Sequence, residues 1–195
     1  TYGVDCDTTT NVLSAAKSHG MKLFQGIFDI NDLDNSISKI TQAVGSDWSH
    51  IHTISVGNEL VQAGQSPATV MAAVSKARSM LRNAGYNGPV VTVDTLVAAI
   101  NHPEICNESD YCAVNSHPFF DPNTSADQAG TFLTTQIGNL RNSLNDRNQH
   151  IVITEAGWPS RGDSNGKAVP SKENQATAVS AIKSAFSGKE ADLTL

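Results

Sequence analysis

The sequence predicts an α/β fold built on a parallel sheet. Short apolar runs alternate along the 195 residues with stretches that carry apolar side chains at helical spacing. Most of the short runs are continuously apolar, which is typical of parallel strands covered on their outer face. The sequence contains neither a Gly-x-Gly-x-x-Gly fingerprint after the first run nor a P-loop motif. A (β/α)8 TIM barrel is therefore favoured over a doubly wound nucleotide-binding sheet.

Six runs of β-forming residues are predicted strands. They are Tyr2–Asp5, Leu23–Asp29, Ile51–Val56, Val90–Val93, Tyr111–Asn115 and Ile151–Thr154, and Leu193–Leu195 is the predicted start of a seventh. A barrel needs eight strands and typically about 250 residues. We therefore expect residues 1–195 to form a single, incomplete catalytic barrel domain that lacks the first strand and most of the eighth. We also expect the natural protein to be longer.

The helices between these strands have recognisable boundaries. Ser66 followed by Pro67 predicts the start of a helix that ends before Gly85. Ser125 and Gln128 have the spacing of a capping box. Apolar stripes on four helices are predicted core contacts. The stripes are Leu33, Ile37, Ile40 and Val44; Val70, Val74, Ala77, Leu81 and Ala84; Ala126, Ala129, Leu133, Ile137, Leu140 and Leu144; and, after Ser171, Val179, Ile182 and Phe186.

Composition excludes several classes of partner. The net charge is −6 and no basic run is present, which argues against binding to nucleic acid or to an anionic membrane surface. No apolar run approaches the roughly 20 residues of a membrane span. The six histidines are scattered, and the sequence has no His-Glu-x-x-His motif, no Cys-x-x-Cys pair and no Gly-x-Ser-x-Gly elbow. We therefore expect no metal or cofactor.

Cysteines and sequons leave alternatives open. The number of cysteines, three, is odd. In a secreted chain, one of them is therefore a free thiol or forms a disulfide with a cysteine outside these residues. Cys106 and Cys112 either close a small loop or remain buried thiols, and Cys6 has no obvious partner. Asn107 and Asn123 both begin Asn-x-Ser/Thr sequons, so each is a candidate for N-glycosylation in a secreted protein.

Two predicted strands lead to a glutamate: Glu155 follows Ile151–Thr154 directly, and Glu59 lies three residues after Ile51–Val56. These segments read Val56-Gly57-Asn58-Glu59 and Ile153-Thr154-Glu155-Ala156-Gly157-Trp158-Pro159-Ser160. Parallel strands of a barrel all end on one rim, so we expect Glu59 and Glu155 to form a pair. Paired carboxylates indicate acid/base chemistry on a glycosidic bond. Alone, each glutamate is as well explained by a salt bridge or by a position at the start of a helix.

The two segments resemble the signatures of glycoside hydrolase family 17, and within it the fungal cell-wall β-1,3-glucanases and glucanosyltransferases. The resemblance covers the whole chain. Further matching segments are Tyr2-Gly3-Val4-Asp5-Cys6, Gly88-Pro89-Val90-Val91-Thr92-Val93-Asp94-Thr95, Ser109-Asp110-Tyr111-Cys112-Ala113-Val114-Asn115-Ser116-His117-Pro118-Phe119-Phe120 and Val169-Pro170-Ser171-Lys172-Glu173-Asn174-Gln175.

The resemblance implies roles for individual residues. It places Glu59 at the end of barrel strand four as general acid/base, and Glu155 at the end of strand seven as nucleophile. Asn58 is similar to the family's asparagine that hydrogen-bonds the sugar 2-hydroxyl. His117 lies where related enzymes place an aromatic residue or a histidine near the nucleophile, although a lone histidine after a strand is usually structural. Asn115 is included with the substrate-binding residues.

Four more substrate-binding candidates each have a structural alternative. Tyr2 resembles a family tyrosine that faces the cleft, or it is a core aromatic. Trp158 either stacks on a pyranose face or packs at the rim. Phe120 lines the substrate groove or packs. Asp94, at a strand end, either accepts hydrogen bonds from sugar or caps the next segment.

The resemblance thus implies a secreted or cell-wall enzyme that cleaves β-1,3-glucan with retention, as an endo-glucanase or a glucanosyltransferase. The sequence does not separate hydrolysis from transfer, because that outcome depends on how acceptor sugars compete with water. The alternative is a wall mannoprotein that binds glucan without turnover.

Overall fold

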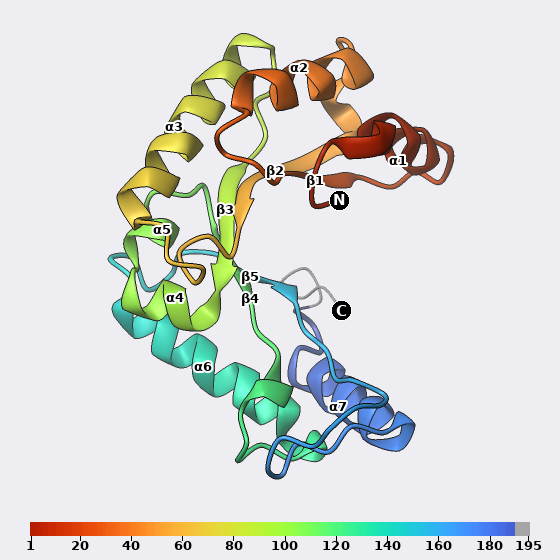
Figure 1. Ribbon diagram of the computed structural model, residues 1–195, viewed down its shortest axis with the longest axis vertical. Coiled ribbons are helices and arrows are strands. Elements are labelled where there is room, and N and C mark those ends of the chain that lie inside the picture. The colour runs from red at the N-terminus through yellow and green to blue at the C-terminus, as the bar shows by residue number, and fades with distance from the viewer. Residues whose placement is uncertain (190–195) are drawn as a thin grey trace. The chain divides into compact units, whose positions relative to one another are not determined.

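The computed structural model describes residues 1–189, in which helices and strands alternate as predicted (Figure 1). Five strands follow one another through the sheet in chain order. They are β1 (Leu23–Ile27), β2 (Ile51–Asn58), β3 (Val90–Thr95), β4 (Cys112–Asn115) and β5 (Ile151–Glu155). The α-helices are α1 (Thr8–Ser18), α2 (Leu33–Val44), α3 (Pro67–Asn83), α4 (Leu96–Asn101), α5 (Glu104–Asn107), α6 (Ala129–Ser143) and α7 (Lys172–Ala185). The 3-10 helices are η1 (Asp5–Asp7), η2 (Trp48–His50), η3 (Pro118–Phe120) and η4 (Ala126–Gln128).

The prediction of a strand at Tyr2–Asp5 is wrong. These residues lead instead into η1 and then α1, which the sequence analysis did not predict. Val4 already leaves the extended conformation, with a φ of −112° and a ψ of 12°, and Asp5 is the first residue of η1. The positive φ angles of 52° at Cys6 and 54° at Asp7 then continue the turn into α1. The predicted strand start at Leu193–Leu195 lies outside the described residues.

The first residue nevertheless pairs with β1. The Thr1 amino group donates to the carbonyl of Phe24 at 2.8 Å, and the Thr1 carbonyl accepts from the N–H of Gly26 at 2.8 Å. A Cβ at position 26 would overlap the backbone of Tyr2, so this close approach requires glycine. Thr1 thus pairs with β1 in a strand-like way, although Tyr2–Asp5 form no strand.

The chain divides into two compact units. One unit consists of residues 1–94 and 104–112, and the other of residues 95–103 together with the chain from 113 onward. The first unit holds β1, β2 and α1 to α3, and the second holds β5, α6 and α7. The expectation of a single domain over 1–195 stays a prediction.

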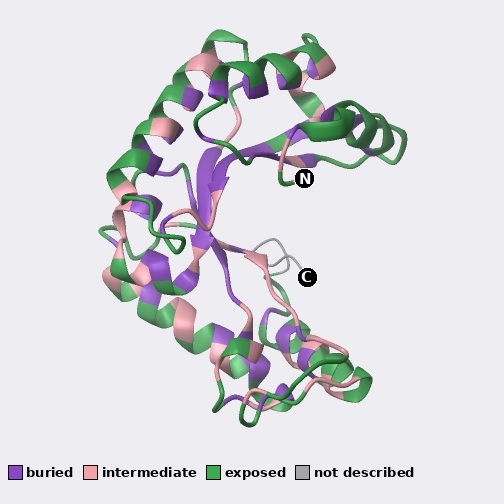
Figure 2. Cartoon of the chain, viewed as in Figure 1, coloured by how far each residue is buried: buried purple, intermediate pink, exposed green. Residues whose placement is uncertain are grey.

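The first unit is built on parallel pairing of β1 with β2 and of β2 with β3. The strands are mostly buried, and the helices keep an exposed outer face (Figure 2). The predicted stripe of α2 is buried, as is that of α3 except for Ala84. Ser66 caps α3 as predicted, with its Oγ accepting from the N–H of Thr69 at 3.1 Å, and α3 ends at Asn83, before Gly85.

A disulfide joins Cys106 to Cys112 in this unit, which decides between the two alternatives left by the sequence. Cys6 is a free, exposed thiol. Between the paired cysteines, the Asp110 carboxylate accepts from the N–H of Val90 at 2.7 Å. The disulfide loop is therefore tied to the start of β3.

Tyr86 is the largest fully buried side chain of the unit, and its hydroxyl lies 3.0 Å from the carbonyls of both His52 and Pro89. We expect Tyr86→Phe to lower the free energy of unfolding by about 1–2 kcal/mol, because two buried carbonyls lose this donor. Burial also raises the pKa of the Tyr86 phenol above its usual value. The folded protein therefore resists ionisation of this phenol more than the unfolded chain does. The resulting contribution to stability is fully present below about pH 10 and is lost as the pH rises further.

Chemical denaturation at neutral pH and at about pH 11 tests this expectation. The wild-type protein should lose more stability over that interval than Tyr86→Phe, which has no phenol at this position. An equal loss in the two proteins would contradict the proposed contribution of Tyr86.

In the second unit, both predicted caps are present, one at the start of η4, which leads into α6, and one at the start of α7. Ser125 and Gln128 form the predicted capping box before α6, and the Oγ of Ser171 accepts from the N–H of Asn174 at 3.0 Å at the start of α7. The predicted stripes are buried, except that Ile137 and Val179 are half-buried. Within residues 1–189, no helix has the length and apolar character required to span a membrane.

Candidate active site

Glu59 directly follows β2 in a left-handed backbone conformation, with a φ of 53°. Its N–H donates to the carbonyl of Val93 at 2.9 Å, so the pairing with β3 extends to Glu59 itself. Two residues earlier, Gly57 has a φ of 79°, and a Cβ there would lie only 2.7 Å from the side chain of Leu60. A non-glycine residue in this region is uncommon and is often found at functional sites. Gly57 thus permits the turn on which Glu59 stands.

Asp94 holds the turn that follows Glu59. Its Oδ2 accepts from the N–H of Val61 at 2.7 Å and its Oδ1 from the N–H of Gln62 at 3.2 Å. The residue is only 1% exposed. Of the two alternatives for Asp94, the structure shows the capping role, in which both carboxylate oxygens accept hydrogen bonds inside the protein.

We expect Asp94→Asn to lower the free energy of unfolding by about 1–3 kcal/mol, because the amide places an N–H group against a buried backbone N–H. Chemical denaturation measures this change. Asp163→Asn, at an exposed carboxylate, is the matched control and should have little effect. Equal effects of the two substitutions would contradict the role given to Asp94.

Glu155 is the last residue of β5, and the segment that follows β4 holds it in place. Its backbone carbonyl accepts from the N–H of Ser116 at 2.9 Å. Its Oε2 lies 3.3 Å from Nε2 of His117. The Glu155 and His117 side chains are 28% and 33% exposed, so the carboxylate is partly shielded but reachable. The contact with His117 fixes the orientation of the Glu155 carboxylate at the end of β5.

Asn115 supports the same strand end. Its Oδ1 accepts from the Thr154 hydroxyl at 2.8 Å, and the residue is only 3% exposed. The predicted sugar contact from Asn115 does not fit this position, because its side chain is buried against β5. Ser116 and Thr154 were not among the predicted site residues, and their small polar side chains at two strand ends were the only signal available.

Trp158 is 4% exposed, and its indole N–H donates to the carbonyl of Val169 at 3.0 Å. Its ring also meets Phe119 edge to face, with 5.3 Å between the centroids. The prediction that Trp158 stacks on a sugar is therefore wrong. The indole packs within the second unit and fixes the loop after Glu155.

Tyr2 and Phe120 are exposed, by 62% and 74%. Tyr2 is therefore not a core aromatic, and Phe120 does not pack fully into the protein. The Phe120 ring meets the His117 ring edge to face, with 6.0 Å between the centroids. Phe120 therefore lies next to the histidine that contacts Glu155. Asn58 is half-buried at the end of β2.

The predicted site residues thus fall into two local groups. Tyr2, Asn58, Glu59 and Asp94 belong to the first unit, and Asn115, His117, Phe120, Glu155 and Trp158 belong to the second. Among the described residues, no group of three or more His, Cys, Asp or Glu side chains is placed to hold a metal ion. Each group presents one partly accessible glutamate on a turn or strand end that backbone hydrogen bonds hold in place.

Comparison with known sequences supplies context for these glutamates. A family model described as the BtgE/BtgC glycoside hydrolase domain matches residues 1–193. Over 186 residues, or 94% of this chain, the sequence is 48% identical to the cell surface mannoprotein MP65 of Candida albicans. It is also 48% identical over 186 residues to the probable family 17 glucosidase SCW10 of Saccharomyces cerevisiae. The chain covers 49% and 47% of these proteins, so it spans about half the length of the curated relatives it matches.

Solved structures match the fold. The glycoside hydrolase family 17 β-1,3-glucanosyltransferase of Rhizomucor miehei superposes with a TM-score of 0.85 at 20% identity, covering 99% of this chain and 72% of that chain. CJP38, a β-1,3-glucanase and allergen of Cryptomeria japonica pollen, superposes with a TM-score of 0.64 at 19% identity, covering 92% of this chain and 79% of that chain. At these identities the likeness concerns the fold alone, and it confirms the predicted barrel class for the part of the chain described.

Proposed function

Because the chain belongs to the BtgE/BtgC glycoside hydrolase family, we propose that it carries the catalytic pair of an enzyme that cleaves β-1,3-glucan with retention. The family match over residues 1–193 is the observation that carries this proposal. A family 17 glucosidase among the relatives supports it. So does the Rhizomucor miehei β-1,3-glucanosyltransferase, of which an active-site mutant was solved with laminaritriose.

In the proposed mechanism, the Glu155 carboxylate attacks the anomeric carbon while the Glu59 carboxylic acid gives its proton to the leaving glycosidic oxygen. The glycosidic C–O bond breaks, and a covalent glucosyl–Glu155 ester forms. Glu59, now ionised, takes a proton from water or from a glucan hydroxyl, whose oxygen attacks the anomeric carbon and releases Glu155. Such a mechanism requires the two carboxyl groups to lie about 5–5.5 Å apart across the scissile bond.

Local geometry supports the division of roles. Glu155 lies 3.3 Å from the His117 ring nitrogen, a contact that holds the proposed nucleophile in one orientation. Glu59 follows β2 on the turn that Asp94 holds. A rigid turn keeps a proton donor in place through both chemical steps.

Substrate contacts are assigned to the accessible candidates. Asn58, next to Glu59, is proposed to hydrogen-bond the sugar 2-hydroxyl, a contact that strengthens in the transition state. The exposed rings of Tyr2 and Phe120 are proposed to contact pyranose faces. Asp94 holds the turn after Glu59, while Asn115 and Trp158 support the segments next to Glu155.

The proposed setting is the fungal cell wall. The relatives include a protein named as a cell surface mannoprotein. N-glycans are proposed at Asn123, which is exposed, and at Asn107, which is half-buried beside the disulfide. A second candidate function, glucan binding without turnover, is favoured only by the name of that mannoprotein.

Product analysis tests the proposal. The full-length protein is incubated with a short laminari-oligosaccharide, and products are followed by NMR and by chain length. We expect the new reducing end to appear first as the β-anomer, whereas products longer than the substrate would identify a transferase acting with the same retention. Binding without cleavage at any pH between about 4 and 7, the range in which carboxylate pairs work, would instead support the non-catalytic role.

A further inference from the structure

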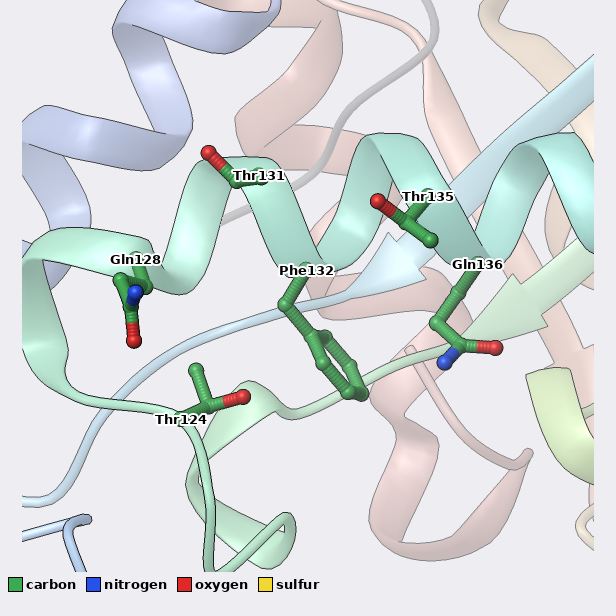
Figure 3. A pocket seen from close by; sticks show the side chains of 6 residues that line it. All are labelled: Thr124, Gln128, Thr131, Phe132, Thr135 and Gln136. Atoms are coloured by element: carbon green, nitrogen blue, oxygen red, sulfur yellow. The ribbon is translucent and has the colours of Figure 1, made fainter.

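A hollow with a volume of about 240 Å³ lies along the first half of α6, within the second unit. Phe132 projects from the helix into this hollow, and in Figure 3 its ring lies between Thr124 and Gln136. The lining residues are Thr124, Gln128, Thr131, Phe132, Thr135 and Gln136. None of the residues assigned above to catalysis or substrate binding is among them.

The lining consists of one aromatic ring surrounded by uncharged polar groups. Hydroxyl groups of threonine and carboxamide groups of glutamine both donate and accept hydrogen bonds. Gln128 uses its Oε1 in the helix cap, where it accepts from Ser125, so it presents amide N–H donors to a ligand. Because no charged side chain lines the hollow, its chemistry suits a neutral, hydroxyl-rich ligand rather than an ion.

The ring supplies the second requirement of a sugar site. Phe132 is half-buried, so one part of its ring is anchored by the protein while another part lines the hollow. A flat apolar face next to hydrogen-bonding groups matches a pyranose ring, whose C–H groups lie on its faces and whose hydroxyls lie on its edge.

A second hollow in the same unit lacks this combination. It is larger, at about 470 Å³, and is lined by Asp127, Ala176, Thr177, Ser180, Ala181 and Ser184. It has a carboxylate and no aromatic ring, so it offers no stacking surface. It provides a matched control for the first hollow.

We propose that the Phe132 hollow binds one glucose unit of a β-glucan chain as an accessory site that holds polymeric substrate on the enzyme. This inference rests on the proposed function for the identity of the sugar. The same chemistry also fits a sugar of an N-glycan on Asn123, which adjoins the hollow through Thr124.

Binding to insoluble β-1,3-glucan tests the proposal in the full-length protein. Phe132→Leu keeps an apolar side chain with good helix propensity but removes the flat ring. We expect it to weaken glucan binding about 3- to 10-fold, in line with the value of an aromatic stacking contact. Thr135→Ala should weaken binding less, and Thr177→Ala, in the control hollow, should leave it unchanged. Cleavage of a short soluble laminari-oligosaccharide should stay the same in all three variants.

The outcomes separate this inference from the proposed function. If the wild-type protein cleaves glucan but Phe132→Leu binds the polymer as tightly, the hollow is not a glucan site. If the wild-type protein binds glucan without cleaving it, and the Phe132→Leu variant loses that binding, the hollow is a glucan site and the catalytic proposal fails. The Asn123→Gln variant, which cannot be glycosylated there, should bind glucan at least as well as wild type. A loss of binding in Asn123→Gln that matches the loss in Phe132→Leu would assign the hollow to the N-glycan and overturn the proposal.

Discussion

Glu155→Gln is expected to lower the kcat for β-1,3-glucan cleavage by roughly 10⁴-fold or more. Glutamine keeps the shape of the side chain and its place beside His117, but its amide cannot attack the anomeric carbon. Neither donor activation nor a change of pH should restore the rate, because the covalent step itself is lost. Initial rates on laminari-oligosaccharides, measured by product chromatography, give the size of the effect.

The control for this substitution is Glu108→Gln, at an exposed glutamate outside the proposed site. It should keep wild-type turnover, and both variants should unfold with similar midpoints in denaturant. A folded Glu155→Gln protein with unchanged turnover would exclude Glu155 as the nucleophile.

The second large effect is expected at Glu59, and it differs in kind. Replacing Glu59 should lower the rate on natural glucan by about 10²- to 10⁴-fold, the usual contribution of general acid/base catalysis. The loss should be much smaller for donors with a good leaving group, because such a group departs without a proton. Glu59→Gly is the preferred variant, since the φ of 53° at this position suits glycine.

Azide separates the roles of the two glutamates. In Glu59→Gly, azide needs no base to attack the glucosyl–Glu155 ester, so it should raise turnover of an activated donor and release the β-glucosyl azide. In Glu155→Gly, azide should instead attack the β-linked substrate directly and release the α-glucosyl azide. NMR of the isolated azides gives the anomer, and the reverse pattern would exchange the assigned roles.

Much of the fold followed from local sequence signals. Nearly continuous runs of β-forming residues predicted β3 and β5, because buried parallel strands need no polar face. Ser66 and the Ser125–Gln128 pair predicted helix starts because capping is a local hydrogen bond. The strand predicted at Tyr2–Asp5 failed because the chain turns into η1 at Val4 and Asp5, and such a turn leaves no mark in an apolar pattern.

The site was predicted less completely, because burial and hydrogen-bond partners come from residues distant in sequence. Glu59 and Glu155 were candidates because of their places near strand ends, and in the structure Glu59 directly follows β2 and Glu155 ends β5. Trp158 looked like a stacking residue, but Val169 and Phe119 enclose it from later and earlier segments. Asp94 accepts a hydrogen bond from the N–H of Val61, which lies 33 residues away in the sequence. Its capping role is therefore visible only in the folded chain.

The most direct test of the account is to trap and locate the covalent intermediate. The probe is a 2-deoxy-2-fluoro β-laminaribiosyl donor with an activated leaving group. The fluorine slows both chemical steps, whereas the leaving group speeds only the first, so the sugar ester should accumulate on the enzyme. Peptide mapping by mass spectrometry should then find one fluorosugar per protein, on the peptide that contains Glu155. A label on any other residue, or no label on a protein that turns over β-1,3-glucan, would contradict the account.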